Sequence, residues 1–356
     1  MDRILAIDVG AGTQDVLIYE CDRTPENWLK MVLPSQTRII GARVRKATAA
    51  SRSVHLAGTL MGGGASTNAI KEHLAAGLSV TATADAARTV HNDLDRVRDI
   101  GIRIDNEPPL DAVVVTLGDI DLNAIERTLA DHEVEMPETV AIAVQDHGYA
   151  PGLGNNDVRF AYLDGLLCQG GDLAQMVYRE PPALMTRMVA VSRLVPGAFL
   201  MDTGAAAVLG VPGDPLVGRM VREEGAILVN VGNMHTFAVL VKGQRLYGLF
   251  EHHTGGISAA IIAELVERLR HGTISNASFQ RDFDGHGAAL DPAYRDEGPF
   301  HFVAITGPNR AIARGLGYHE AVPHGDMMLT GAFGLVEGVF LERVAQGGIP
   351  GPTLSW

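Results

Sequence analysis

The apolar residues of this chain gather in short runs that alternate with glycine-rich turns and amphipathic stretches. The runs at 4–9 and 15–20 predict a hairpin, and segment 226–241 repeats the same pattern. Further strands are predicted at 39–44, 53–57, 113–117, 139–144, 194–201 and 301–306. Helices are predicted at 68–76, 121–131, 203–210, 257–269 and 327–344, and 148–182 reads as loops with short helices. Strands that alternate with helices predict an α/β fold with parallel or mixed sheets.

The two predicted hairpins carry similar turns. The first reads Asp8-Val9-Gly10-Ala11-Gly12-Thr13-Gln14 and the second Asn230-Val231-Gly232-Asn233-Met234-His235-Thr236. Glycine allows close approach and positive φ, and successive backbone N–H groups form a concavity that binds anions. Two such turns facing each other would hold a polyphosphate from both sides, which predicts nucleotide chemistry.

Length and charge narrow the class of protein. A chain of 356 residues exceeds one ordinary core, so two domains are expected. The formal net charge is -13 and Lys and Arg form no dense run, which argues against nucleic acid or an anionic membrane as partner. Because we find neither a signal-peptide pattern nor an apolar run of spanning length, we expect a soluble cytoplasmic protein.

The cysteine content excludes one kind of chemistry. The chain has two cysteines, Cys21 and Cys168, and no CxxC pair. A zinc site or an iron–sulfur cluster built from cysteines of this chain alone is therefore not expected, and two lone cysteines suit a reducing compartment.

The order of short motifs resembles the superfamily of actin, sugar kinases and heat-shock-chaperone ATPases. Its phosphate, connecting-helix and adenosine motifs are matched in order by Asp8–Thr13, Asp202–Ala207, Asn230–Thr236, Thr306–Arg310 and Thr330–Gly334. Each match is weak alone, but the ordered set covers nearly the whole chain. The chain also resembles an uncharacterised family often labelled as a pyruvate formate-lyase activating enzyme. Radical enzymes of that kind need three clustered cysteines, which this chain lacks.

The resemblance implies an actin-like ATPase fold. Two ribonuclease-H-like domains, each built on a mixed five-stranded sheet, would close around a nucleotide cleft. We expect the first domain to comprise 1–205 plus 335–356 and the second 206–334.

The resemblance also implies ligands for ATP and Mg²⁺. Asp8 would orient the metal ion through water. Asn230 replaces the aspartate usual in the second phosphate motif, and an amide supplies no charge to hydrated Mg²⁺. The remaining expected nucleotide contacts are Gly10, Ala11, Gly12, Thr13, Gln14, Gly232, Asn233, Thr236, Gly255, Gly256, Gly307, Pro308, Asn309 and Arg310.

Two further carboxylates are catalytic candidates. In related kinases an aspartate at the position of Asp202 takes the proton of the acceptor hydroxyl, although aspartate here also suits a helix N-cap. Asp146, with His147, ends a predicted buried strand, where α/β sheets place ligands. The alternative for this pair is an ordinary turn.

Three other segments leave their roles open. Gly62-Gly63-Gly64 could cradle a phosphate at a helix N-terminus or form a flexible turn. His252 and His253 should point to opposite sides of an extended segment. Segments 62–110 and 148–182 are the expected specificity elements.

The function predicted first is an ATP-dependent phosphotransferase that acts with Mg²⁺ on a small polar metabolite. The alternatives are an ATPase that activates a partner metalloenzyme or redox enzyme, and a nucleotide sensor with low turnover. The expected partners are a nucleotide and either a small-molecule acceptor or a protein client, and a homo-oligomer is an open option.

Overall fold

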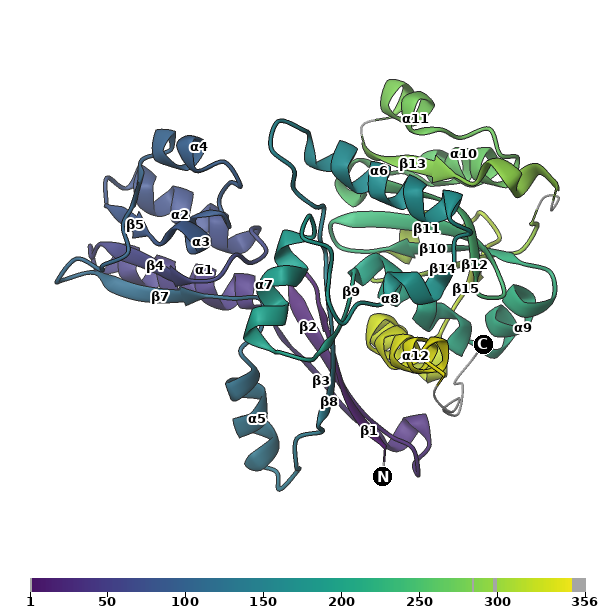
Figure 1. Cartoon of the computed structure of the whole chain (residues 1–356), viewed down its shortest axis with the longest axis horizontal. Helices are drawn as coiled ribbons and strands as arrows, with labels where there is room; N and C mark the ends of the chain where they lie inside the picture. The colour runs from purple at the N-terminus through teal and green to yellow at the C-terminus, as the bar shows by residue number, and fades with distance from the viewer. Residues whose placement is uncertain (1, 284, 297–299, 348–356) are drawn as a thin grey trace.

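The computed structural model describes residues 2–283, 285–296 and 300–347, and it contains three β-sheets (Figure 1). The first sheet has the strand order β3-β2-β1-β8-β9. Its strands are β1 (Arg3–Val9), β2 (Thr13–Glu20), β3 (Leu29–Pro34), β8 (Thr139–Val144) and β9 (Phe199–Met201). The first three form an antiparallel meander, and β8 and β9 continue parallel to β1. This mixed five-stranded order is the ribonuclease-H-like arrangement that we predicted.

The second sheet repeats that order with an extra strand at one edge, β13-β12-β11-β10-β14-β15. Its strands are β10 (Ala226–Val231), β11 (His235–Lys242), β12 (Arg245–His253), β13 (Gly285–Leu290), β14 (Val303–Thr306) and β15 (His319–Glu320). β10 to β12 are again antiparallel, and β14 runs parallel to β10. The protein thus has the actin-like ATPase fold, and its second sheet has one strand more than the predicted five.

A third sheet, which we did not predict as a unit, is inserted between β3 and β8. Its parallel strands follow the order β6-β5-β4-β7: β4 (Val54–Gly58), β5 (Val80–Ala82), β6 (Ile102–Ile104) and β7 (Val113–Leu117). Its helices are α1 (Gln36–Ala49), α2 (Ala65–Ala75), α3 (Ala84–Ala87) and α4 (Leu94–Asp99). Helix α5 (Leu122–Ala130), which follows β7, packs on the first sheet instead. Figure 1 shows this inserted domain on the far side of the first sheet from the second sheet.

Helix α1 corrects the strand predicted at 39–44. Its buried residues Ile40, Val44 and Ala47 recur at helical spacing, so one apolar stripe faces the core of the inserted domain. The β-branched pair Ile39-Ile40 had favoured a strand, but the helical period governs the segment.

Two predictions in the middle of the chain were also wrong in extent. Segment 148–182 contains a 14-residue helix, α6 (Asn155–Cys168), in place of scattered short helices. The strand predicted at 194–201 is reduced to β9, because Leu194 ends α7 (Thr186–Leu194).

The remaining helices are α8 (Thr203–Gly210), α9 (Pro215–Glu223), α10 (Ala259–Arg270), α11 (Asn276–Asp282) and α12 (Thr330–Ala345). Helices α8 and α12 lie between the first and second sheets, where buried residues of both sheets form one core around them (Figure 1). Their backbones touch, since a Cβ on Gly334 would collide with the Ala206 carbonyl and one on Gly210 with the Thr330 carbonyl. The absence of a side chain at Gly210 and Gly334 therefore permits the close packing of the two helices.

The predicted domain boundaries, 1–205 plus 335–356 and 206–334, stay a prediction. Residues 348–356 of the first predicted domain lie outside the described residues.

Candidate functional site

The turns of the two predicted hairpins have the same geometry. The N–H of Gly10 donates to the Thr13 carbonyl, and the N–H of Gly232 donates to the His235 carbonyl, both at 2.9 Å. The strands of the two hairpins also pair in the same register. Asp8 pairs with Asp15 in the first hairpin, and Asn230 pairs with Phe237 at the matching position of the second. His235 therefore occupies in the second turn the place that Thr13 has in the first.

The tips of both turns carry free donors. Within the described part of the chain, the backbone N–H groups of Ala11, Gly12, Asn233 and Met234 have no protein acceptor. Neither tip is buried, and Met234 is 56% exposed. Each turn thus presents consecutive N–H groups, as anion-binding turns do.

The first hairpin and strand β14 reach the beginning of α12. Gly331 lies against the Asp8 carboxylate, where a side chain would collide with it, and Thr330 Oγ1 is 3.4 Å from Thr306 Oγ1 at the end of β14. Asp8 Oδ1 is buried without a hydrogen-bond partner among the described residues. Burial, and then the charges of Asp15 and Asp202, raise the pKa of Asp8 well above its ordinary value.

The predicted adenosine motif lies beside the second turn. Asn309 donates its N–H to the Val231 carbonyl (3.0 Å) and its side-chain amide to the Gly232 carbonyl (2.9 Å). Gly307 has φ +98° and packs so closely on Val231 and Asn230 that a Cβ would clash. Arg310 pairs with Glu320 at 3.1 Å, and Pro308 is exposed.

Other predicted contacts have mainly structural partners. The Gln14 side chain is 4% exposed and donates to the Pro34 carbonyl, and the Ala11 carbonyl accepts from the hydroxyls of Ser35 and Thr37. Thr236 is fully buried, 3.1 Å from the Thr254 hydroxyl.

Gly255 and Gly256 lie in an exposed turn before α10. A pocket of about 260 Å³ lies beside the first hairpin and is lined by Gln14 and by residues of α1 and α5.

Asp202 caps α8 and holds a buried arginine. Its Oδ1 accepts from the Gly204 N–H at 2.9 Å, which confirms the N-cap prediction. Arg159 of α6, 4% exposed, donates to both Asp202 oxygens (3.0 and 3.1 Å) and to Oε2 of Glu251 (2.7 Å). Although burial opposes its charge, the two carboxylates raise the pKa of Arg159 above its usual range. The arginine joins α8 to β12 of the second sheet.

Asp146 organises the turn after β8. Its Oδ2 accepts from the N–H groups of Arg187 and Met188 (2.8 and 2.9 Å) and its Oδ1 from Gly148 (2.8 Å). Burial raises the pKa of Asp146, although these N–H groups act against the rise. The carboxylate thus holds the start of α7, and its predicted catalytic role stays a prediction.

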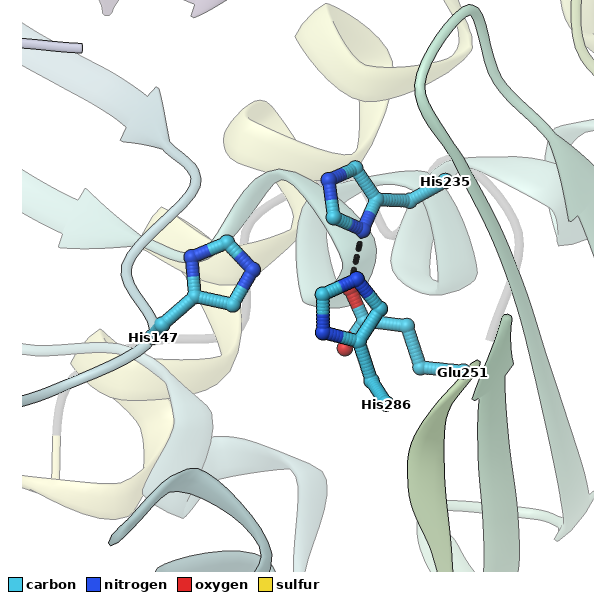
Figure 2. Close-up of side chains that lie close together, drawn as sticks. All are labelled: His147, His235, Glu251 and His286. Atoms are coloured by element: carbon cyan, nitrogen blue, oxygen red, sulfur yellow. Dashed lines mark ion pairs between the residues drawn. The ribbon is translucent and has the colours of Figure 1, made fainter. Parts of the chain in front are cut away.

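A cluster of histidines beside Arg159 is the feature that sequence reasoning missed. One ligand atom each of His147, His235, Glu251 and His286 can be chosen so that all lie within 4.8 Å of one another (Figure 2). We had singled out only His147 among them, as the neighbour of Asp146. The four come from distant segments, so no spacing rule marks them.

The cluster combines one charged carboxylate with two imidazoles, His147 and His286, that burial keeps neutral. Burial acts to raise the pKa of Glu251, but the Arg159 guanidinium outweighs it and holds that pKa far below its ordinary value. Burial, and then the Arg159 charge, lower the pKa of His147 to about 4. Burial lowers the pKa of His286 to about 3. Both rings are therefore neutral at pH 7, with a lone pair available.

The neighbouring histidines of β12 point apart, as predicted. His252 packs against Phe279 and Phe283, whereas Nδ1 of His253 lies 3.1 Å from Nε2 of His286. His253 thus borders the cluster, and His252 belongs to the opposite face.

The glycine run 62–64 meets a buried ion pair. The Gly62 N–H donates to Asp119 (3.0 Å), which also receives two hydrogen bonds from Arg187 (2.6 and 2.7 Å). A Cβ on Gly62 would lie 2.5 Å from Nη2 of Arg187. Arg187 of α7 also donates its N–H to Asp146 (2.8 Å) and its guanidinium to the Gln145 carbonyl (2.7 Å), so this pair attaches the inserted domain to the region of the cluster.

Comparison with known families gives one match. Residues 61–312 match the family described as "Putative pyruvate format-lyase activating enzyme (DUF1786)". No relative is found among curated proteins. Within the described residues, no helix combines the length and apolar character needed to cross a bilayer.

Solved structures give distant matches. The ethanolamine utilization protein EutJ from Carboxydothermus hydrogenoformans is 11% identical, with 94% of this chain and 89% of that chain covered and a TM-score of 0.33. A "putative sugar kinase" from Cytophaga hutchinsonii is 11% identical (94% and 99% covered, TM-score 0.31). The Ppx/GppA phosphatase of Aquifex aeolicus is 10% identical (97% and 92% covered, TM-score 0.26).

Proposed function

The chain belongs to the DUF1786 family, and from that premise we propose that it binds ATP with Mg²⁺ between its two glycine turns and transfers or hydrolyses the γ-phosphate. The observation that carries the proposal is the twin turn geometry at Gly10 and Gly232. The unpaired N–H groups at both tips supply donors for phosphate oxygens. The N-terminus of α12, which lies beside Asp8 of the first hairpin, adds a favourable dipole for anions.

Asp8 fits the predicted role in binding Mg²⁺. Its Oδ1 is a buried carboxylate oxygen without a protein partner, and hard oxygen ligands are what Mg²⁺ takes. A cation there would offset the repulsion that Asp15 and Asp202 exert on Asp8. When bound, Mg²⁺ neutralises phosphate charge, which is the main requirement of phosphoryl transfer. Asn230, at the matching place in the second hairpin, offers an amide to the phosphates or their water.

Asp202 is proposed as the residue that orients the acceptor or the attacking water. Its hydrogen bonds with Arg159 fix the direction of the carboxylate. The adenosine end of the nucleotide is assigned to Gly307–Arg310, because Asn309 ties that turn to the second hairpin.

A second candidate function is an ATPase whose closure acts on a partner enzyme. The observation that favours it is that Arg159 occupies both oxygens of Asp202, so a small acceptor would have to displace the arginine first. The family description also names an activating enzyme. Radical chemistry is not part of this proposal, because Cys21 and Cys168 are the only cysteines of the chain and cannot hold a cluster alone.

Calorimetric titration with ATP, with and without Mg²⁺, tests nucleotide binding. Gly12→Ala is the sharp variant, because a Cβ at Gly12 meets nothing within 4 Å and can disturb only what occupies the open space. Gly165→Ala, also in open space but within α6, is the matched control. We expect Gly12→Ala to weaken ATP binding at least about tenfold, a loss of about 1.4 kcal/mol, and Gly165→Ala to leave it unchanged.

Asp8→Asn should remove the Mg²⁺ dependence, whereas Asp22→Asn in the exposed turn after β2 should not. If ATP, ADP and GTP all fail to bind the wild-type protein, the proposal fails. Acceptor-dependent ATP consumption would favour the phosphotransferase, and hydrolysis stimulated by a co-purifying protein would favour the activator.

A further inference from the structure

We propose that His147, His235, Glu251 and His286 bind one divalent transition-metal ion beside the second glycine turn, with ligands other than those proposed for Mg²⁺–ATP (Figure 2). The four ligand atoms converge from the loop after β8 and from β11, β12 and β13. The site goes beyond the proposed nucleotide function and does not depend on it.

The second sheet is built to bring three of the ligands together. His235 and Phe237 share a face of β11, and Phe237 pairs with Glu251, so His235 and Glu251 project from the same face. On β13 the register skips: Glu251 pairs with Gly287 and His252 with Gly285. His286 is therefore the extra residue of a β-bulge, a feature that re-aims a side chain next to functional sites.

Two imidazole nitrogens in the cluster have no hydrogen-bond partner among the described residues. Nε2 of His147 and Nδ1 of His235 are both buried. Nδ1 of His235 lies 2.9 Å from Oε1 of Glu251, the ion-pair contact marked in Figure 2, without a hydrogen bond to it. Leaving buried polar atoms unpaired is costly. Ligand atoms directed at a common ion account for both.

Neighbouring side chains fix the orientation of the other two ligands. Asn156 Oδ1 lies 2.8 Å from Nδ1 of His286, which places the proton on Nδ1 and the lone pair on Nε2. Nδ1 of His253 lies 3.1 Å from this Nε2, and a metal ion would take its place as the partner of the lone pair. Arg159 binds Oε2 of Glu251 (2.7 Å) and the Gln145 amide donates to Oε1 (3.0 Å). Such outer contacts to metal-binding histidines and carboxylates are the usual support of a metal site.

The ligand set selects the class of ion. Imidazole nitrogen suits zinc, iron, nickel and copper, whereas Mg²⁺ and Ca²⁺ prefer oxygen. Three imidazoles and one carboxylate are therefore a donor set for a transition metal such as zinc, iron, nickel or copper. The carboxylate oxygen of Asp8 suits Mg²⁺, so the two sites call for different ions.

The ion would also cross-link the two halves of the molecule. His147 follows β8 of the first sheet, and the other three ligands belong to the second sheet. The ligand atoms lie up to 4.8 Å apart, whereas Zn–N bonds of about 2.0–2.1 Å need donors closer than that. Metal binding therefore draws His147 toward the second sheet.

The test is titration of the chelator-treated, tag-free protein with Co²⁺, followed by its visible absorption, and then displacement of Co²⁺ by Zn²⁺. We expect one Co²⁺ per chain with the absorption of nitrogen ligation. His147→Ala and His286→Ala should each weaken binding more than about 100-fold. Asn156→Ala, which removes only the outer contact to His286, should weaken it by about 10–100-fold. His271→Ala, an exposed histidine at the end of α10, is the matched control and should leave binding unchanged.

The absence of stoichiometric Co²⁺ and Zn²⁺ binding, or binding that survives both His147→Ala and His286→Ala, would overturn the proposal. Circular dichroism of each metal-free variant establishes that it is folded, and either histidine variant alone is sufficient for the test. ATP titration of the same proteins keeps this result separate from the nucleotide proposal, because loss of metal binding with normal ATP binding concerns only the histidine cluster.

Discussion

Replacement of Arg159 with methionine is expected to destabilise the folded protein by about 3–5 kcal/mol at pH 8, the usual cost of removing one partner of a buried ion pair. Arg159 is 4% exposed and Glu251 is 1% exposed, so solvent cannot replace the lost charge. The substitution deletes hydrogen bonds to Glu251 (2.7 Å), the Asp146 carbonyl (2.6 Å) and both oxygens of Asp202 (3.0 and 3.1 Å). Methionine retains most of the apolar volume, so the loss reports charge and hydrogen bonding.

The pH dependence of this loss has a definite sign. In the wild-type protein the lowered pKa of Glu251 stabilises the fold above the ordinary pKa of a glutamate, and that stability fades as the pH falls. In the variant, burial acts without the arginine and raises the pKa of Glu251, so stability falls as the pH rises through the new value. The difference between the two proteins should therefore be smaller at pH 5 than at pH 8.

Urea unfolding in the presence of a chelator measures the effect. Trp28, 4% exposed and packed on Tyr19, reports the first half by fluorescence, and far-UV circular dichroism reports the whole chain. Adding Glu251→Gln to Arg159→Met removes the stranded charge and should recover at least about 1 kcal/mol at pH 8. A loss below about 1 kcal/mol at pH 8, or equal losses at pH 5 and pH 8, would refute the account of Arg159 as the neutralising charge.

Two further predictions concern the first hairpin and the helix crossing. Burial raises the pKa of Asp15 to about 6 from 3.8, so its ionisation costs the folded state stability as the pH rises from 4 to 6, about 3 kcal/mol in total. Asp15→Asn should abolish that decline in urea unfolding at successive pH values, and an unchanged pH profile would contradict it. Gly334→Ala drives a methyl group into the Ala206 carbonyl and should cost about 1–3 kcal/mol. Thermal unfolding of Gly334→Ala is compared with that of the control Gly165→Ala, whose added Cβ meets no neighbouring atom. Equal unfolding midpoints would show that the two helices can move apart without cost.

Several elements could be predicted because their signals are local. Each glycine turn lies between two apolar strands within one short segment, so the pattern alone predicted both hairpins. Asp202 precedes a run of small residues, which predicted the capped helix α8, and the structure confirms the cap. The order of these motifs along the chain was sufficient to predict the actin-like fold.

The errors arose where one local signal was ambiguous. The pair Ile39-Ile40 fits a strand by β-propensity and a helix by spacing, and packing of Ile40, Val44 and Ala47 against the inserted sheet decided for the helix. Helix α6 has apolar residues on several sides, so its period was weak. It lies against β13 and carries Arg159 inward, a role that depends on residues far away in the chain.

The sequence by itself determined the two phosphate-type hairpins, the connecting helices and their order, because each depends on residues that are neighbours in the chain. Only the tertiary structure decided that Arg159 joins Asp202 to Glu251, and that His147, His235, Glu251 and His286 meet. These side chains come from α6, from the end of β8 and from three strands of the second sheet. A β-bulge at His286 and the pairing of the two halves around α8 and α12 bring them together. Contacts of that kind follow from strand register and helix packing, which leave no periodic trace along the chain.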